Sequence, residues 1–309
     1  MKVALLAGGV GGAKMAEGFA ALDEVDLTVI GNVADDDDFH GLWVSPDIDT
    51  LTYTLAGLID REQGWGVADE GRRALEVLGQ LGADTWMFLG DRDFGLHIYR
   101  TERRRRGDRP TLIAADVARA FGVTSQIVLP TDEVVQTRVD TAQGWLRFQE
   151  YFVKEKCSPT VHAIEFVGIE QARPTPEALA ALDDADLIVI APSNPLVSIR
   201  PILEIPGIAA AVRAASAPVI AVSPLIAGRV VKGPADRMMV ALGYHADVVG
   251  IAEIYADLAN TLVIDTADAG LSEEVRAVGP TPHTTEIYMR DLDSKARLAR
   301  EIVSLGDIA

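Results

Sequence analysis

The sequence has little of the chemistry that metal clusters and disulfides need. Its 309 residues include one cysteine, Cys157, so no disulfide within the chain and no cluster of thiolate ligands can form. The five histidines show no HxxxH or related spacing, which gives no sign of a zinc site. No apolar run of about 18 residues occurs, and too few apolar residues precede the first glycines for a signal-peptide core. We therefore expect a cytoplasmic protein.

Positive charge is also scarce. The chain has 28 lysines and arginines against 46 aspartates and glutamates, a formal net charge of −18. Binding to nucleic acid or to an anionic membrane begins with cations that neutralise phosphates, so this composition disfavours both partners. An anionic small molecule would need a local cationic pocket. The hydrophobic share of 49% indicates a globular protein with a well-packed core.

Short apolar runs rich in β-branched residues recur along the chain, and stretches with helical periodicity separate most of them. The runs are 2–8, 26–32, 85–91, 125–130, 186–194, 218–225 and 261–268, and the clearest helical stretches are 13–22, 174–185 and 234–243. Because the runs do not alternate polar with apolar residues, we predict a doubly wound, mostly parallel Rossmann-like α/β sheet. Residues 131–175 break the pattern, so we expect an inserted lid or subdomain there, within one domain over 1–309.

Four glycines follow the first predicted strand. Gly8, Gly9, Gly11 and Gly12 surround Val10 and precede Lys14 at a helix start; glycines let backbone N–H groups approach a ligand, and a helix N-terminus favours an anion. Two known phosphate loops do not fit, since Lys14 replaces the third glycine of the dinucleotide fingerprint and is not followed by serine or threonine as in a P-loop. Either the loop holds phosphate, or it is a tight turn whose glycines only allow close packing.

The second predicted strand leads through Asn32 into four consecutive aspartates, 35–38, followed by Asp47 and Asp49. Carboxylates at this density repel one another unless a cation or solvent relieves them, and Mg²⁺ carrying substrate phosphates would do so. We expect Asp35 and Asp49 to be functional, and Asp37 and Asp38 to form a solvated turn. In the alternative interpretation Asp49 only caps the helix that follows it.

Three more stretches carry candidates. Arg92 stands between two aspartates in GDRDFGLH; it either binds a phosphate or carboxylate or forms a local salt-bridge turn. His97 is either a general base or a half-buried helix residue. Ser193, Asn194 and Ser198 form either a second anion loop or a plain strand-to-helix connection. The run RTERRRRG at 100–107 is a solvated helix face or a landing patch for an anionic substrate.

Seven motifs occur in the order of a known family. They are AGGVGGAK, GNVADD, HGLWVSPDIDTLTYTLAG with GWG after it, LGDRDFGLH…RTE, LRFQEYFV, APSNPLVSIRPIL and VSPLIAGRVVKGPADRMM. From residue 1 to about 240 the sequence resembles the 2-phospho-L-lactate transferase (CofD-type) family of deazaflavin coenzyme F420 biosynthesis.

This resemblance implies a Mg²⁺-dependent transferase. Such enzymes pass a phospho-acid from its guanosine diphosphate conjugate to the ribityl hydroxyl of 7,8-didemethyl-8-hydroxy-5-deazariboflavin, called the deazaflavin below, and release GMP. It implies a nucleotide site made by Gly8, Gly9, Val10, Gly11, Gly12, Lys14, Asn32, Ser193, Asn194 and Ser198. It likewise implies a deazaflavin site made by Asp47, Asp49, Arg92 and His97, catalysis by Asp49 and Arg92, Mg²⁺ on Asp35 and Asp49, and a homodimer.

The residues can support this chemistry. Attack of a hydroxyl on a diphosphate needs charge neutralisation and positioning more than a protein nucleophile. Asp49 is the first candidate to accept the hydroxyl proton. Because asparagine can also cap a helix, we expect Asp49→Asn to leave the fold intact while it nearly abolishes transfer.

Two other classes share part of the pattern. Non-catalytic nucleotide-sugar-binding regulators resembling the gluconeogenesis-factor family have a similar glycine-rich first turn and VADD-like second turn, but SPDIDT and GDRD favour the transferase. Lys14 argues against a nicotinamide dehydrogenase, because it replaces the third glycine of the dinucleotide fingerprint. No residue chooses among phospholactate, phosphoenolpyruvate and phosphoglycerate as the acid transferred.

Overall fold

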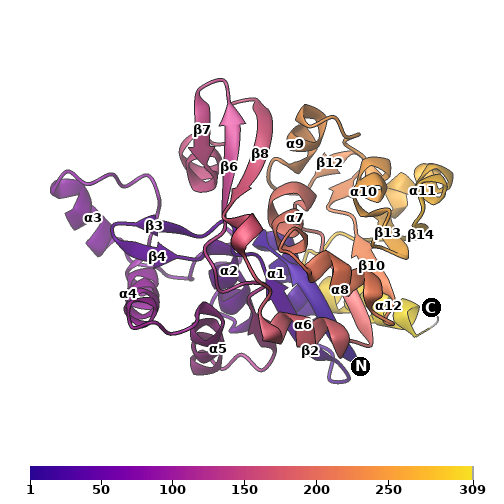
Figure 1. Cartoon of the computed structure of the whole chain (residues 1–309), viewed down its shortest axis with the longest axis horizontal. Coiled ribbons are helices and arrows are strands. Elements are labelled where there is room, and N and C mark those ends of the chain that lie inside the picture. Colours follow the sequence, from indigo (N-terminus) through magenta and orange to yellow (C-terminus); the bar gives the residue numbers. More distant parts are fainter. Residues whose placement is uncertain (308–309) are drawn as a thin grey trace.

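A computed structural model, which describes residues 1–307, has a seven-stranded sheet at its centre, in the order β14-β13-β10-β9-β1-β2-β5 (Figure 1). Every neighbouring pair in it is parallel. The strands are β1 (Lys2–Ala7), β2 (Asp26–Gly31), β5 (Gln126–Val128), β9 (Leu187–Ile190), β10 (Val219–Val222), β13 (Thr261–Asp265) and β14 (Thr281–Thr285). The predicted doubly wound parallel sheet is confirmed.

Two strand predictions need correction. Residues 85–91 form no strand; Trp86 packs edge-on against Phe39 with ring centroids 5.5 Å apart, and the stretch leads into a helix at Asp91. The apolar side chains of this run pack in a local cluster away from the central sheet. β14 escaped prediction because its sequence, TPHTT, has no apolar run. It is an edge strand, where a proline such as Pro282 is tolerated.

Helices cover both faces of the sheet, which is why its central strands carry apolar residues on both faces. Along β1, Val3 and Leu5 pack on one face and Ala4 and Leu6 on the other. The first face carries α1 (Gly9–Ala20), α2 (Pro46–Leu55), α5 (Pro110–Ala120) and α12 (Leu292–Gly306). The second carries α6 (Pro176–Asp183), η3 (Pro195–Ile199), α7 (Arg200–Leu203), α8 (Ile208–Ala214), α10 (Val248–Tyr255) and α11 (Ser272–Val278).

The remaining elements lie outside these layers. They are α3 (Arg73–Gln80), α4 (Asp91–Arg105), α9 (Ala235–Ala241), the short helices η1 (Glu150–Lys154), η2 (Ile169–Gln171) and η4 (Thr266–Leu271), and the hairpins β3 (Asp37–Phe39) with β4 (Leu42–Val44) and β11 (Leu225–Ile226) with β12 (Arg229–Val230). Across residues 1–307, no single helix is long and apolar enough to cross a membrane, although η3–α7 and α8 pass the same test as a pair bent by 82°.

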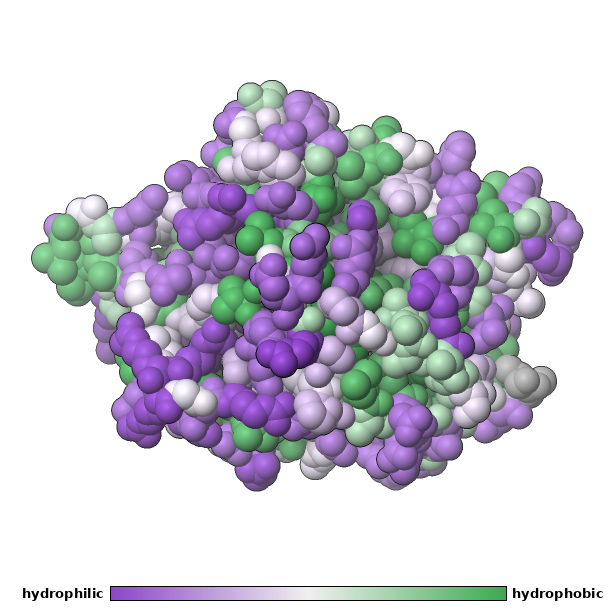
Figure 2. All heavy atoms as spheres, in the orientation of Figure 1, coloured by the Kyte–Doolittle hydropathy of each residue, from purple (hydrophilic) through white to green (hydrophobic). Residues whose placement is uncertain are grey.

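The segment 131–175 forms its own antiparallel sheet. Its order is β7 (Gly144–Arg147), β6 (Gln136–Thr141) and β8 (Val161–Val167). Figure 1 shows it rising from one edge of the molecule near α9. That this segment is a lid stays a prediction. On the face drawn in Figure 2 hydrophilic side chains prevail, and an apolar area lies at α3, where Val77 and Leu81 are exposed.

Candidate active site

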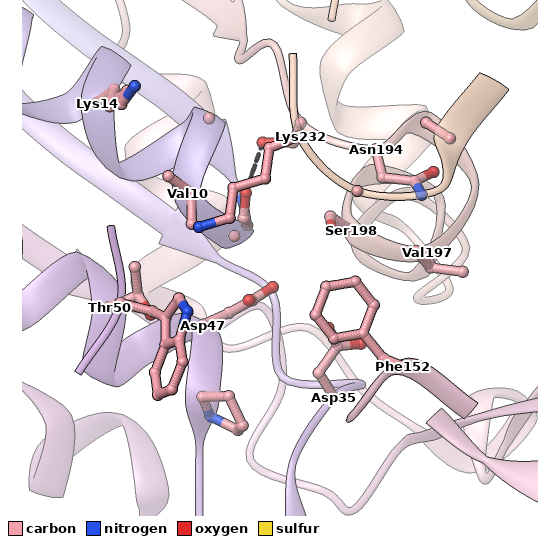
Figure 3. A pocket seen from close by; sticks show the side chains of 18 of the residues that line it. Val10, Lys14, Asp35, Asp47, Thr50, Phe152, Asn194, Val197, Ser198 and Lys232 are labelled. Atoms are coloured by element: carbon pink, nitrogen blue, oxygen red, sulfur yellow. Dashed lines mark hydrogen bonds between the residues drawn. The ribbon is translucent and has the colours of Figure 1, made fainter. Parts of the chain in front are cut away.

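The centre of the sheet contains a topological switch point. β1 and β9 are neighbours, and the sheet extends from β1 through β2 and β5 on one side and from β9 through β10 and β13 on the other. Chain connections that leave in opposite directions open a crevice at the carboxyl ends of such strands. A cavity of about 550 Å³ lies there, lined by the loops after β1 and β9, by α2 and α4, by the β12–α9 connection and by side chains of the 131–175 segment (Figure 3).

The glycine loop closes one end of the cavity. α1 begins at Gly9 with no side-chain cap and no acidic residue in its first turn, so its first N–H groups can bind an anion. Gly11 must be glycine, because a Cβ there would lie 2.2 Å from the Pro192 carbonyl oxygen. The Gly8 N–H donates to Ser193 Oγ at 3.2 Å, and that hydroxyl donates to the Gly8 carbonyl oxygen at 2.7 Å. The loops after β1 and β9 are therefore joined.

Most of the predicted nucleotide residues meet at this end. Those that line the cavity are Gly8, Gly9, Val10, Gly11, Lys14, Ser193, Asn194 and Ser198. Gly12 instead packs inside the fold, where a Cβ would lie 2.9 Å from both Ala7 Cβ and Ser193 Oγ. Asn32 is buried behind the lining and donates from Nδ2 to Asp47 Oδ2 at 2.9 Å, so it orients a carboxylate.

Two lysines give this end positive charge without a carboxylate partner. Lys14 donates to the Met289 carbonyl oxygen at 3.2 Å, and Lys232 reaches toward Val10 from the opposite wall (Figure 3). Neither Lys14 nor Lys232 forms an ion pair with any described carboxylate. Among the other four lysines of the chain, Lys2, Lys154 and Lys295 each form one. Burial lowers the pKa of Lys14, and the charges of Lys295 and Lys232 lower it further. Sequence analysis missed Lys232, whose only signal was its place in a family motif.

Asp35 and Asp47 face the cavity with little to balance their charge (Figure 3). Burial raises the pKa of Asp35 well above its usual range, and the charge of Asp47 adds to this effect. Asp35 Oδ1 has no hydrogen-bond partner among residues 1–307. Within the same range no three acidic, histidine or cysteine side chains form a metal-ligand group. Two carboxylates suit Mg²⁺, which keeps waters and substrate phosphates as its other ligands.

Asp49 is not a helix cap. α2 begins at Pro46 after Ser45, which puts Asp49 inside the first turns of the helix. Its Oδ2 accepts from Nη1 of Arg100 on α4 at 3.1 Å, its Oδ1 accepts from Nη2 of the same guanidinium, and both side chains are buried. Arg100 donates to both oxygens of Asp49, whereas Asp47, near Asp35, accepts from the neutral Asn32 amide and pairs with no cationic side chain among residues 1–307.

Arg92 does not lie with the other predicted residues. Its exposed side chain donates to the Ala68 carbonyl oxygen at 3.0 Å and does not line the cavity. Because α4 begins at Asp91, the residues that face inward are Asp93, His97 and Arg100, spaced by four and three positions. The structure gives no support for Arg92 at the reacting phosphate, and its catalytic role stays a prediction.

His97 is fully buried, and the half-buried interpretation is wrong. Burial lowers the pKa of His97 to about 4, although Asp49 opposes the shift. Its Nδ1 lies 3.3 Å from Arg100 Nη1, which can only donate, and its buried Nε2 has no hydrogen-bond partner among residues 1–307. Beside it, Tyr53 donates its hydroxyl to Asp93 Oδ1 at 2.7 Å, and burial raises the pKa of Asp93 to about 6.

Aromatic side chains form another part of the cavity lining. Trp65 and Phe88 pack edge to face with centroids 6.2 Å apart, and Phe148 stacks on Phe152 at 5.6 Å. Such walls suit a planar heteroaromatic ring. Trp65 and Phe152 keep 40% and 38% of their surface exposed, so there is free area for a ligand to cover. The only sequence signals were the motifs GWG and LRFQEYFV.

The arginine run 103–106 lies outside the cavity. Arg103 pairs with Asp108 and Asp116, and Arg104 lies over the Trp43 ring at 4.1 Å from its centroid. Arg105 donates to the Gly41 carbonyl oxygen. These contacts fix the end of α4 against its surroundings, which favours a structural role for the run.

Known proteins resemble this chain over nearly its whole length. The family model described as "2-phospho-L-lactate transferase CofD" matches residues 3–302. A phosphoenolpyruvate transferase of Streptomyces coelicolor is 39% identical, over 99% of this chain and 98% of that protein. A 2-phospho-L-lactate transferase of Methanopyrus kandleri is 37% identical, over 99% and 97%. A solved Bacillus halodurans protein of the UPF0052 family superposes with a TM-score of 0.63 at 16% identity, over 98% of each chain, and shows the fold alone. By the family match and by these relatives, the chain belongs to the CofD family of 2-phospho-L-lactate transferases.

Proposed function

We propose that the protein transfers a phospho-acid from its guanosine diphosphate conjugate to the ribityl hydroxyl of the deazaflavin, in coenzyme F420 biosynthesis. Family membership and the names of the relatives support a transferase of this pathway. They weigh against the nucleotide-sugar-binding regulator. The finer assignment of substrates is our inference from the cavity.

One observation carries this proposal: a single cavity is lined by the glycine loop with Lys14, by buried carboxylates and by aromatic side chains. The first turn of α1 and Lys14 suit the diphosphate, and the loop of Ser193, Asn194 and Ser198 faces the guanosine. The walls of Trp65 and Phe88 suit the planar deazaflavin ring. A donor and an acceptor in these positions would have their reacting atoms at the carboxylates.

The chemistry is a displacement at phosphorus. The ribityl oxygen attacks the phosphorus that bears the acid, the bond from this phosphorus to the bridging oxygen breaks, and GMP leaves with that oxygen. The product is a phosphodiester between the deazaflavin and the acid. Each Asp49 oxygen that accepts from Arg100 keeps a second lone pair, so Asp49 can accept a hydrogen bond from the hydroxyl and then its proton. The α1 amides and Lys14 hold the diphosphate in place.

Asp35 and Asp47 would hold Mg²⁺, which when bound neutralises phosphate charge during transfer. This revises the pair expected from the sequence, Asp35 and Asp49, because Arg100 pairs with Asp49. Asp35→Asn and Asp47→Asn should both weaken Mn²⁺ binding, measured by electron paramagnetic resonance in the presence of GDP. Unchanged Mn²⁺ affinity in Asp47→Asn would restore Asp49 as the second ligand.

The experiment that tests the function is direct. The protein is incubated with the deazaflavin and, in turn, with the guanylated phospholactate, phosphoenolpyruvate and phosphoglycerate conjugates, with Mg²⁺ or with excess EDTA. We expect GMP and one phosphodiester by mass spectrometry, only with Mg²⁺. Tight binding of a conjugate without GMP release from any of the three would contradict the transferase and favour the regulator.

We also propose a twofold homodimer, from the family resemblance and the prevalence of such dimers among intracellular enzymes. Light scattering at micromolar concentration should give about twice the chain mass of 33.1 kDa. A mass near that of one chain would contradict the dimer.

A further inference from the structure

Two segments with exposed residues line the cavity and meet each other. One is the loop of residues 60–66, called the mouth loop below, and the other is the β12–α9 connection that carries Lys232. The Lys232 ammonium donates to the Gln63 carbonyl oxygen. A Cβ at Gly64 would lie 3.2 Å from Val10 Cγ1 and 3.5 Å from Lys232 Nζ, so the mouth loop, the glycine loop and Lys232 converge on one point.

The mouth loop is a preformed unit. The Asp60 carboxylate accepts from the N–H groups of Glu62 and Gln63 at 2.9 and 3.0 Å and from Gln63 Nε2 at 2.7 Å. The Gly64 N–H donates to the Asp60 carbonyl oxygen at 2.7 Å. Internal bonds of this kind let the loop move as one body. It carries Trp65, so its position decides the shape of the wall that Trp65 forms with Phe88.

Few polar contacts tie the tip of this loop to the rest of the protein. Arg61 pairs with Glu17 on α1 at 2.8 Å, and Arg61 is more than half exposed. Among residues 1–307, the other link is the bond from Lys232 to Gln63. Its acceptor is a neutral carbonyl, whereas hydrogen bonds between an ammonium and a phosphate oxygen are charge-assisted and roughly twice as strong as neutral ones. Lys232 also repels the nearby Lys14, a cost that an anion between them removes.

We propose that Lys232 exchanges partners when a diphosphate binds: Nζ leaves the Gln63 carbonyl for a phosphate oxygen, and the mouth loop with Trp65 is released. Binding of the nucleotide thereby controls access to the wall formed by Trp65 and Phe88, so the donor conjugate binds before the deazaflavin. The choice of these two ligands rests on the proposed function, whereas the exchange itself requires only a nucleoside diphosphate.

The test uses GDP as the probe, without transfer. GDP affinity is measured by calorimetry, and hydrogen exchange is followed in peptides covering residues 58–68. We expect GDP to speed exchange there in the wild type. Lys232→Met should weaken GDP binding by about tenfold or more, the equivalent of losing one charge-assisted contact. It should also show fast exchange without GDP, and no further change when GDP is added. Lys232→Arg should restore most of the affinity.

Arg61→Met is the matched control, because it removes the other link of the mouth loop without touching the glycine loop. It should speed exchange in residues 58–68 and leave GDP affinity within about twofold, a small effect on the free-energy scale. GDP affinity unchanged in Lys232→Met would overturn the phosphate contact. Equal weakening in both variants, or exchange in wild-type residues 58–68 that does not respond to GDP, would overturn the exchange of partners. Failure of the transfer assay alone would leave these results unaffected.

Discussion

Replacing Asp49 by asparagine should destabilise the protein, against the expectation from the sequence that the fold stays intact. Arg100 is 7% exposed, and its guanidinium donates to both oxygens of Asp49. Asparagine keeps one acceptor and loses the charge. Removing one partner of a buried ion pair costs about 3–5 kcal/mol. Asp36 also attracts Arg100, so we expect the lower end, about 3 kcal/mol.

Urea unfolding followed by circular dichroism measures this loss, provided that the slope of the unfolding free energy against urea stays unchanged. Arg100→Met should be destabilised as well, because it leaves the Asp49 carboxylate buried and unpaired. The double variant Asp49→Leu with Arg100→Met buries no unpaired charge and should recover most of the loss. An Asp49→Asn protein within about 0.5 kcal/mol of wild type, as for an ordinary surface substitution, would refute the buried pair.

The same variant still tests the catalytic role of Asp49. Domains have about 5–15 kcal/mol of stability, so a loss near 3 kcal/mol leaves most molecules folded. Single-turnover rates at saturating Mg²⁺ then report chemistry on folded protein. A fall of about 10²-fold or more would fit a lost proton acceptor, whereas a rate within about threefold, well below that effect, would leave Asp49 only its contact with Arg100.

Three further changes have expected outcomes. Lys14→Ala should weaken binding of the guanosine conjugate by about tenfold or more and binding of the deazaflavin far less, because a charge at a helix start acts on phosphate. Equal losses of affinity for the two ligands by calorimetry would contradict this. Gly11→Ala should destabilise the fold, since its Cβ would lie 2.2 Å from the Pro192 carbonyl oxygen. Gly95→Ala, whose Cβ would meet open space, should stabilise α4 slightly. Equal unfolding midpoints for the two variants would contradict this prediction. Burial raises the pKa of Asp93 from 3.8 to about 6, so the native protein binds this proton more tightly than the unfolded chain does. The protein therefore loses stability as the pH rises through 4–6. Relative to wild type, Asp93→Asn should therefore gain roughly 3 kcal/mol between pH 4 and 7; a difference independent of pH would contradict it.

The sheet was predictable because its signal is local. Each buried strand needs an apolar run, and the glycines and prolines around it mark where it ends. The run at 85–91 satisfied the same rule and failed, since packing of Trp86 on Phe39 consumes its apolar side chains outside the sheet. The TPHTT strand shows the converse: an edge strand with polar residues has no local signal to read.

The site was predictable where the backbone makes it. Gly8 to Gly11 and the 193–198 loop are fixed by strand ends, and the sheet brings those ends together whatever the surrounding helices do. Residues such as Lys232 and Trp65 reach the cavity from connections of irregular structure. No periodicity in the sequence says which way such side chains point.

Helix phase explains the two places where the side-chain arrangement differs most from the one expected from the sequence. α2 starts at Pro46, four residues before the start that the sequence suggested; Asp49 pairs with Arg100, and Asp47 is left facing Asp35. α4 starts at Asp91, where a strand was expected, and a helix from that point turns Arg92 outward and brings Arg100 inward nine residues after its start. Each successive helical residue rotates by about 100°, so a small error in a boundary changes which side chain faces the substrate. The cation expected at position 92 therefore lies at position 100, and the carboxylate expected to bind metal holds that cation in place.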